Sequence, residues 1–375
     1  MRENTFKFQI NNYWRNIDKN ILIGFILLFF LGIFFSFSST SFLAGERLNK
    51  NYYFFFSKHL SYAVIAVFIM FYVSFINLNR LKNSILPLFI FSFFLLILVP
   101  IVGVEVKGSK RWLDLYFFRL QPIELLKPFF ILICAKILSL NKSNSLNTNY
   151  LFSFFLLSSI LIFLMNQPDI GQSILLAGTW ISIVFISGIK IIYLIIFSIL
   201  IIFALTVILF FLPEKFNYIF VRLKSFIDPS KGDNFQTEKA LEAIKLGGLK
   251  GRGMGEGILK DKVPEAHTDY IIAIITEEFG SIISILIILI FLYISFRIIK
   301  IATQQNDFNL KISLCGLCSL LIFQTFIHIG VNTSLLPTTG ITLPFLSYGG
   351  SSLVGSALLA GVILNYTKNR IDENE

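Results

Sequence analysis

A carboxylate stands at the entrance to a long apolar run in the second half of this sequence. The segment 264–269 reads PEAHTD, and the apolar run begins at Tyr270. At the mouth of a membrane helix the dielectric falls, so burial raises the pKa of a carboxyl group while a nearby cation or metal lowers it. Asp269 is therefore placed to take a proton from a hydroxyl group. A helix start is equally a place for an N-cap, and the two roles are compatible.

Two further carboxylates, Glu277 and Glu278, lie inside the same apolar run. Each costs roughly 2.5 kcal/mol or more in a spanning helix. Neighbouring residues point about 100° apart on a helix, so both cannot face lipid harmlessly. The pair predicts a polar cavity or charged partners. Glu124 and Lys127, spaced i, i+3, offer such partners; they form an ion pair of their own, or Lys127 binds a pyrophosphate.

Polar and conformationally special residues gather in three other segments. Lys107, Lys110 and Arg111 beside Trp112 form a cationic, aromatic rim that suits an anionic head group. In 167–171, Pro and Gly bracket Asp169 in the manner of broken helices that line cavities. The segment 336–352, LPTTGITLPFLSYGGSS, is rich in hydroxyl groups and either hydrogen-bonds a ligand or packs tightly through its small residues.

Glycines alternate at positions 251, 253, 255 and 257. Alternating glycine allows unusual dihedral angles and close backbone approach. The pattern is neither a P-loop nor a convincing dinucleotide fingerprint, so taken alone it favours a flexible turn.

Several classes of protein are excluded by what the sequence holds. Three histidines, His59, His267 and His328, and no G-x-S-x-G motif argue against a Ser-His-Asp hydrolase. The three cysteines lie in apolar runs, which argues against a disulfide framework. The net charge of +10 is carried largely by short loops beside apolar runs, so we set nucleic acid aside.

The elements that position these residues are membrane helices. The chain is 55% hydrophobic and 14% charged, whereas soluble domains carry roughly 25% charged residues. A spanning helix needs about 20 largely apolar residues. Candidate spans are 21–39, 59–78, 84–104, 123–140, 150–166, 172–188, 190–212, 270–296, 310–335 and 347–366. We therefore predict an all-α polytopic membrane protein with about ten transmembrane helices.

Basic residues predict the orientation of these spans. An even number of spans places both termini on one side, whose short loops and span ends hold fourteen Lys and Arg against seven opposite. The positive-inside rule then puts the termini in the cytoplasm. The long loop 213–269 falls outside and is excluded from the count; its ten Lys and Arg would reverse the tally.

This layout predicts a cytoplasmic segment 1–20, a membrane domain 21–366 and a cytoplasmic tail 367–375. Within the long loop, a short apolar stripe in 236–246 predicts a helix lying on the membrane surface or packed on the bundle.

These segments together resemble the SEDS family (shape, elongation, division and sporulation). The family's R-W-[IL] and QPSE-x-x-K motifs resemble Arg111 to Leu113 and Gln121 to Lys127, with Ile123 in place of Ser. Its QPD-x-G, its glycine-rich HTDF…EE-x-G and its SYGGSS motifs are similar to 167–171, 247–280 and 347–352, with Tyr270 in place of Phe. The resemblance covers nearly the whole chain, and PTTGITLPF at 337–345 is closest to the family's division branch.

The resemblance implies a peptidoglycan glycosyltransferase that polymerises lipid II into β-1,4 glycan strands and releases undecaprenyl pyrophosphate. Asp269 is then the base, or the ligand of a divalent cation, Mg²⁺ or Mn²⁺, that activates the hydroxyl. The substrate-binding residues implied are Arg111, Lys127, Lys260, His267, Glu124, Glu277, Glu278, Ser347 and Ser351. Expected partners are a class B penicillin-binding protein, which is a transpeptidase, and other proteins of the division septum.

Two other functions fit the same residues. Intramembrane carboxylates and a lysine also suit a lipid flippase or an ion-coupled carrier. A third alternative is a non-enzymatic scaffold for division proteins. A polymerase makes product in detergent without a membrane barrier, whereas a scaffold tolerates substitution of Asp269 in cells.

Overall fold

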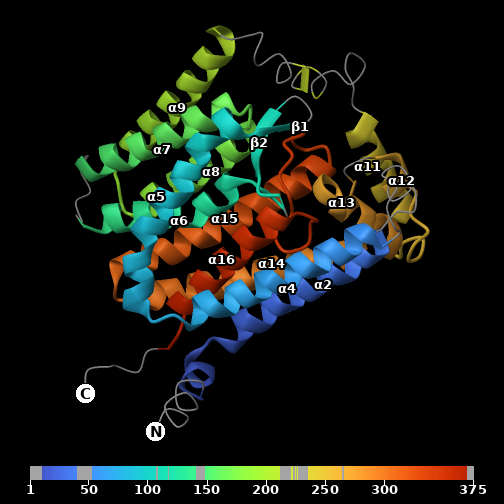
Figure 1. Cartoon of the computed structure of the whole chain (residues 1–375), viewed down its shortest axis with the longest axis horizontal. Helices are drawn as coiled ribbons and strands as arrows, with labels where there is room; N and C mark the ends of the chain where they lie inside the picture. The colour runs from blue at the N-terminus through green and yellow to red at the C-terminus, as the bar shows by residue number, and fades with distance from the viewer. Residues whose placement is uncertain are drawn as a thin grey trace.

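The computed structural model describes residues 11–39, 53–106, 109–116, 118–140, 148–211, 221–222, 224, 226, 235–263 and 266–369. Its long helices are α2 (Lys19–Ser39), α4 (Phe54–Phe75), α5 (Leu78–Val102), α6 (Pro122–Ser139), α7 (Thr148–Asn166), α8 (Ile170–Ile186), α9 (Ile191–Phe211), α14 (Ile271–Gln304), α15 (Phe308–Asn332) and α16 (Gly350–Tyr366). Figure 1 shows them as one bundle. Each of the predicted spans coincides with one of these helices, which confirms the all-α polytopic fold class.

The helices differ in how well they meet the requirements for crossing a membrane. Within the described residues, 6 helices, namely α2, α4, α5, α7, α14 and α15, are long and apolar enough by length and composition. Helices α8 and α16 and the stretch Ile191–Ala204 of α9 are apolar but shorter, and α6 carries Glu124, Lys127 and Lys136. The predicted count of ten crossings therefore stays a prediction.

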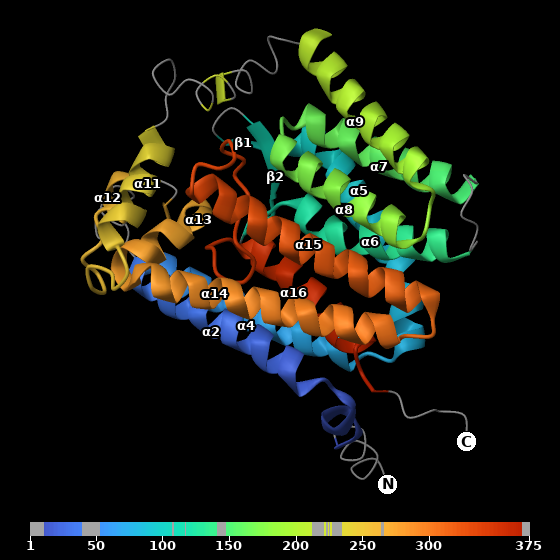
Figure 2. The same ribbon diagram turned by 180° about the vertical axis from the view of Figure 1, so that it is seen from behind.

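Large apolar side chains cover the outside of the bundle, for example Phe68, Ile101 and Phe203, which are all exposed. Such a surface suits lipid as the surrounding solvent. Inside, α4 packs along α16, and α14 lies between α2 and α15 (Figure 2). A small residue permits one of these close approaches, because a Cβ added at Gly355 of α16 would lie 2.6 Å from the carbonyl oxygen of Glu124.

A small antiparallel sheet connects α5 to α6. It comprises β1 (Val104–Val106), β2 (Ser109–Asp114) and β3 (Arg119–Leu120), in the order β1-β2-β3. Val104 pairs with Trp112, and Leu113 pairs with Leu120. The predicted fold, which was all helical, did not include this sheet. It matters because it carries Arg111, Trp112 and Arg119 to one end of the bundle.

Helix α14 is broken at Gly280, where φ is 86° and ψ is 165°. A break frees backbone groups that need new hydrogen-bond partners. The neighbouring glycine-rich turn supplies them: Arg252 N donates to Glu277 O (2.9 Å), Gly253 N donates to Glu278 O (3.0 Å), and Ser281 N donates to Gly248 O (2.9 Å). The segment turns here, and its backbone is docked against that of α14.

Three short helices cover this contact: α11 (Phe235–Gly247), α12 (Leu259–Lys262) and α13 (Ala266–Asp269). Ala240 and Ala243 of α11 are buried in a small apolar cluster with Val263, Ala266 and Tyr270. Of the two predictions for the 236–246 segment, packing on the bundle is the one observed.

The two described ends of the chain meet at the other end of the bundle, away from the sheet and α13 (Figures 1 and 2). Asn369 N donates a hydrogen bond of 2.8 Å to Asn16 O. The two described ends therefore lie on one face of the protein, as an even number of spans requires.

Candidate active site

A cavity of about 1020 Å³ opens at the end of the bundle that carries the sheet. Among the described residues, four basic side chains line it, Lys58, Arg111, Arg119 and Arg222, against two carboxylates, Asp114 and Asp269. Its other lining residues include Phe54, Phe55, Tyr62, Trp112, Tyr116, Gln121, Thr268, Thr339, Gly340, Thr342, Tyr348, Ser351 and Ser352. The cavity therefore combines an excess of positive charge with aromatic and hydroxyl groups, which suits a ligand that carries both phosphate and sugar.

Asp269 is the last residue of α13 and lines this cavity. The N-cap position of α14 is occupied by Tyr270, so the prediction that Asp269 caps that helix is wrong. Its carboxylate faces the segment before α16, since a Cβ added at Gly340 would lie 3.7 Å from Asp269 Oδ2. Its backbone is anchored by Asn332, whose Nδ2 donates to Asp269 O at 3.0 Å. The carboxylate is thus half-buried on a fixed backbone.

Ser347 and His267 lie outside the cavity and make contacts that hold α13 in place. Ser347 Oγ donates to Thr268 O (2.7 Å) and accepts from Leu343 N (2.8 Å). The carbonyl of His267 accepts from Tyr348 N at 3.1 Å, and its ring lies 5.4 Å from that of Tyr348. Both were predicted to bind substrate; neither is among the residues that line the cavity.

Ser351 does line the cavity, where α16, the sheet and α6 meet. Its hydroxyl donates to Arg119 O at 3.0 Å and accepts from Gln121 N at 2.9 Å. It therefore ties the start of α16 to the strand that carries one of the cavity's cations.

Arg111 links the sheet to the turn between α7 and α8. Its Nε donates to Gln167 O at 3.2 Å and lies 3.8 Å from Asp169 Oδ2, and its Nη2 donates to Pro168 O. Asp169 caps α8 through Gln172 N at 3.4 Å. Burial raises the pKa of Asp169 above its ordinary value, and the Arg111 guanidinium opposes that rise. The 167–171 segment was predicted to line a cavity. It forms the wall against which Arg111 is held.

Glu124 and Lys127 form a buried ion pair, with Lys127 Nζ 2.9 Å from Glu124 Oε2. Gln172 Nε2 donates to Glu124 Oε1 at 2.8 Å, and Lys127 Nζ donates to Gln324 Oε1 at 3.5 Å. A void of about 10 Å³ lies beside them. This confirms the predicted ion pair and places both residues outside the lining of the large cavity.

Glu277 and Glu278 have polar partners, as predicted, but on the glycine-rich segment and α2 rather than on α6. Glu277 accepts hydrogen bonds from Ile258 N (2.9 Å) and Leu259 N (3.0 Å). Glu278 accepts a hydrogen bond from Ser38 Oγ. Glu277 therefore anchors the covering segment and Glu278 bonds to α2, and neither residue lines the cavity. Lys260 belongs to α12, and its side chain falls outside the described residues.

Three of the four cavity cations lie outside the motifs that predict a site in the sequence. Lys58 and Arg119 entered only the count of basic residues on one side of the membrane, and Arg222 belongs to the long loop. Arg222 Nη1 donates to Thr338 O at 3.1 Å, which attaches that loop to the segment facing Asp269. A shared membrane face was the one signal available for Lys58 and Arg119; no spacing in the sequence links them.

The donor set of the cavity restricts how a divalent cation could bind. Among the described residues, no three His, Cys, Asp or Glu side chains form a metal-binding group. The cavity offers the carboxylates of Asp114 and Asp269. This fits the mode usual for Mg²⁺, in which one or two carboxylates and the phosphates of the ligand share the ion.

Comparisons with known proteins agree on one family. Residues 18–371 match the FtsW/RodA/SpoVE model, described as cell cycle protein. Two proteins named probable peptidoglycan glycosyltransferase FtsW are similar: that of Caulobacter vibrioides is 30% identical over 96% of this chain and 91% of its own, and that of Buchnera aphidicola from Acyrthosiphon pisum is 36% identical over 92% and 87%. A structure titled "Structural coordination of polymerization and crosslinking by a peptidoglycan synthase complex" shares the fold, with TM-score 0.74, 22% identity and coverage of 94% and 97%.

Proposed function

The chain belongs to the FtsW/RodA/SpoVE family, and from this membership we infer that it is a peptidoglycan glycosyltransferase, the activity in the names of its FtsW relatives. It is a multi-pass protein of the bacterial inner membrane. The observation that carries the assignment to a particular site is the position of Asp269 in a large cavity lined by four cations.

The donor substrate is lipid II, in which a pyrophosphate joins the sugar to the lipid. Lys58, Arg111, Arg119 and Arg222 supply the positive charge that such a pyrophosphate needs. Aromatic side chains at the sheet, including Trp112 and Tyr116, offer faces on which a sugar can stack. A cavity of about 1020 Å³ has room for more than one sugar ring.

The reaction is attack of the acceptor's GlcNAc 4-hydroxyl on the anomeric carbon of the donor. Asp269 accepts the hydroxyl proton as the new β-1,4 C–O bond forms. The bond from the anomeric carbon to the pyrophosphate breaks, and undecaprenyl pyrophosphate leaves with the electron pair. The cationic side chains stabilise its developing charge. A divalent cation held by Asp269 and the phosphates would neutralise further charge on the pyrophosphate.

The test of this site is lipid II polymerisation by purified Asp269→Asn protein. Loss of a general base typically costs 10²- to 10⁴-fold in rate, so we expect a fall of roughly that size. The matched control is Asp307→Asn, which makes the same change at the other end of the bundle and leaves the rate unaltered. Glycan polymer at the normal rate from the Asp269 variant would remove this carboxylate from catalysis.

The same assay separates the alternatives. Polymer formed in detergent, with no membrane barrier, is the product of a polymerase and cannot come from a flippase. Chelation by EDTA is expected to stop the reaction, and Mg²⁺ or Mn²⁺ to restore it. Full activity in EDTA would mean that the reaction needs no metal and that Asp269 acts as a base alone.

The family membership also supports a place in cell division. Both termini face the cytoplasm, the protein acts at the septum, and a class B penicillin-binding protein crosslinks the strands that it makes. The related structure titled as a peptidoglycan synthase complex supports such a pairing. Copurification of the chain with its cognate transpeptidase tests it, and the rate with and without that partner tests whether the partner stimulates polymerisation.

A further inference from the structure

A second hollow, of about 710 Å³, lies at the opposite end of the bundle from the active site. Helix α4 connects the two: Phe54 and Phe55 at its start line the active cavity, while Tyr72 and Phe75 at its end line the second hollow. About 20 residues of helix separate them, which is roughly 30 Å and close to the thickness of a bilayer core. The second hollow therefore faces the other surface of the membrane, beside the described ends of the chain.

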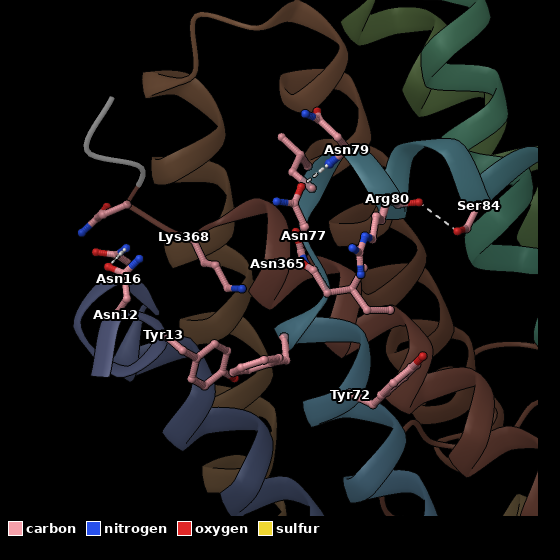
Figure 3. A pocket seen from close by; sticks show the side chains of 14 residues that line it. Asn12, Tyr13, Asn16, Tyr72, Asn77, Asn79, Arg80, Ser84, Asn365 and Lys368 are labelled. Atoms are coloured by element: carbon pink, nitrogen blue, oxygen red, sulfur yellow. Dashed lines mark hydrogen bonds between the residues drawn. The ribbon is translucent and has the colours of Figure 1, made fainter. Parts of the chain in front are cut away.

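The lining of this hollow is basic and rich in amides (Figure 3). Arg80 and Lys368 lie on either side of Asn77 and Asn365, and no acidic residue is among the described residues that line it. Four further asparagines, Asn12, Asn16, Asn79 and Asn369, complete the polar wall. Two cations without a carboxylate in the lining favour an anionic ligand.

One wall of the hollow is held rigidly. Asn365 Nδ2 donates to Val73 O (3.0 Å), Ser74 O (3.1 Å) and Ile76 O. Lys368 Nζ donates to Ser74 O and lies 4.8 Å from the centre of the Tyr13 ring. The carbonyl oxygens at the end of α4 thus already accept hydrogen bonds from Asn365 and Lys368. The ammonium group of Lys368 is therefore held in a fixed position.

Arg80 is available to a ligand. It lies exposed in the first turn of α5, and its guanidinium makes no hydrogen bond or ion pair with any residue that the structure describes. Lys82, two residues on, is instead paired with Asp307 at 2.9 Å. The first turn of a long helix adds partial positive charge at the same place.

We propose that this hollow binds the phosphate of an anionic phospholipid head group. The amides of Asn77 and Asn79 beside Arg80 can donate to phosphate oxygens and to a head-group hydroxyl. Tyr72 and Phe75 line the hollow and are exposed, and the exposed Trp14 ring lies 5.5 Å from that of Tyr13 in the lining. Such aromatic residues mark the interface where head groups meet acyl chains. The apolar edge favours a lipid over a phosphate from water, since only the lipid has chains to lie along it.

The experiment titrates purified full-length protein in detergent with short-chain phosphatidylglycerol, using the rise in Tm as the readout. Phosphatidylcholine of equal chain length tests for charge, and glycerol 3-phosphate tests for a water-borne phosphate. The variants are Arg80→Gln alone, which disturbs no described contact, and Arg80→Gln with Lys368→Gln. The matched control is Lys300→Gln, an exposed cation near the Arg297–Asp18 pair outside the hollow.

We expect phosphatidylglycerol to raise Tm where phosphatidylcholine does not, and the double variant to bind it roughly 30-fold more weakly, the effect of two cations at an anionic surface. The single Arg80 variant binds phosphatidylglycerol with intermediate affinity, and the Lys300 variant binds it normally. Equal stabilisation by glycerol 3-phosphate would overturn the lipid assignment. Unchanged binding in the Arg80 variants, or an equal loss in the Lys300 variant, would overturn the site itself.

Discussion

Glu124 and Lys127 bring opposite charges into the centre of the bundle, where each has one more polar partner, Gln172 and Gln324. Both side chains are almost fully buried. A buried pair of this kind contributes little net stability compared with apolar residues, yet removing one partner leaves the other charged and without compensation. The pair therefore makes the bundle sensitive to single substitutions even though neither residue lines the active cavity.

We accordingly predict that Lys127→Met lowers the free energy of unfolding by about 3–5 kcal/mol, because it leaves the Glu124 carboxylate buried alone. The double variant Glu124→Gln with Lys127→Met recovers most of that loss. Thermal unfolding in detergent measures both. A Lys127→Met protein that unfolds normally but makes no polymer would instead show that Lys127 acts on the substrate.

At the scale of elements, the break in α14 and the glycine-rich turn form one unit. A Cβ at Gly280 would lie 2.1 Å from Leu249 O, and one at Gly251 would lie 2.3 Å from Glu278 O. No side chain fits between two backbones at such distances. The turn comes before α13 in the chain and the break at Gly280 comes after it, so the unit fixes both sides of the segment that carries Asp269.

We predict that Gly280→Ala destabilises the protein by more than the roughly 1 kcal/mol that positive φ alone costs an alanine, because the methyl group also collides with Leu249 O. The matched control is Gly255→Ala: its φ of 85° resembles the 86° of Gly280, but nothing lies within 4 Å of an added Cβ. Thermal unfolding and limited proteolysis of the 248–263 segment measure the difference. Equal effects of the two substitutions would mean that the collision is relieved without cost.

The start of α15 offers a pH-dependent contact. Asp307 caps the helix through Asn309 N (2.9 Å) and Leu310 N (3.4 Å) and pairs with Lys82. Burial alone would raise the pKa of Asp307, but the hydrogen bonds from Lys82 and the backbone outweigh it and lower the pKa below 3.8. A lowered carboxyl pKa contributes stability that is present above the unfolded value and is lost as pH falls through the folded one.

Asp307→Ala is therefore expected to cost about 1 kcal/mol at neutral pH, the usual loss of a helix cap. The difference from the unaltered protein shrinks as pH falls below 3.8. Unfolding measured at neutral pH and below pH 3.8 tests this. Asp307→Asn is the variant that keeps the cap. A difference that is constant with pH would exclude ionisation of Asp307 as its source.

At the scale of the whole molecule, the helices could be predicted and their breaks could not. Length and apolarity alone placed the spans, although the span predicted at 59–78 begins earlier, at Phe54. The break at Gly280 depends on backbone partners around Gly248 and Arg252, which no periodicity reveals. The same holds for the site: Asp269 follows from its motif, whereas Lys58 reaches it from α4 and Arg119 from β3. Contacts between distant segments carry no local signal.

Orientation in the membrane is the prediction on which the whole arrangement depends, because the active cavity and the chain ends lie on opposite faces. With the native cysteines replaced by alanine, we predict that a membrane-impermeant maleimide labels Lys110→Cys, an exposed residue of β2, in intact spheroplasts. Gln304→Cys, exposed at the end of α14, is labelled only after permeabilisation.

The count of basic residues supports this orientation only while the long loop is left out. Long loops cross the membrane largely regardless of charge, which is the physical reason for leaving it out. The reverse labelling pattern would place Asp269 in the cytoplasm, where the donor sugar would have to be joined before it crossed the membrane. Glycan synthesis on the outer face would then be impossible for this chain, and the lipid proposed at Arg80 would belong to the outer leaflet.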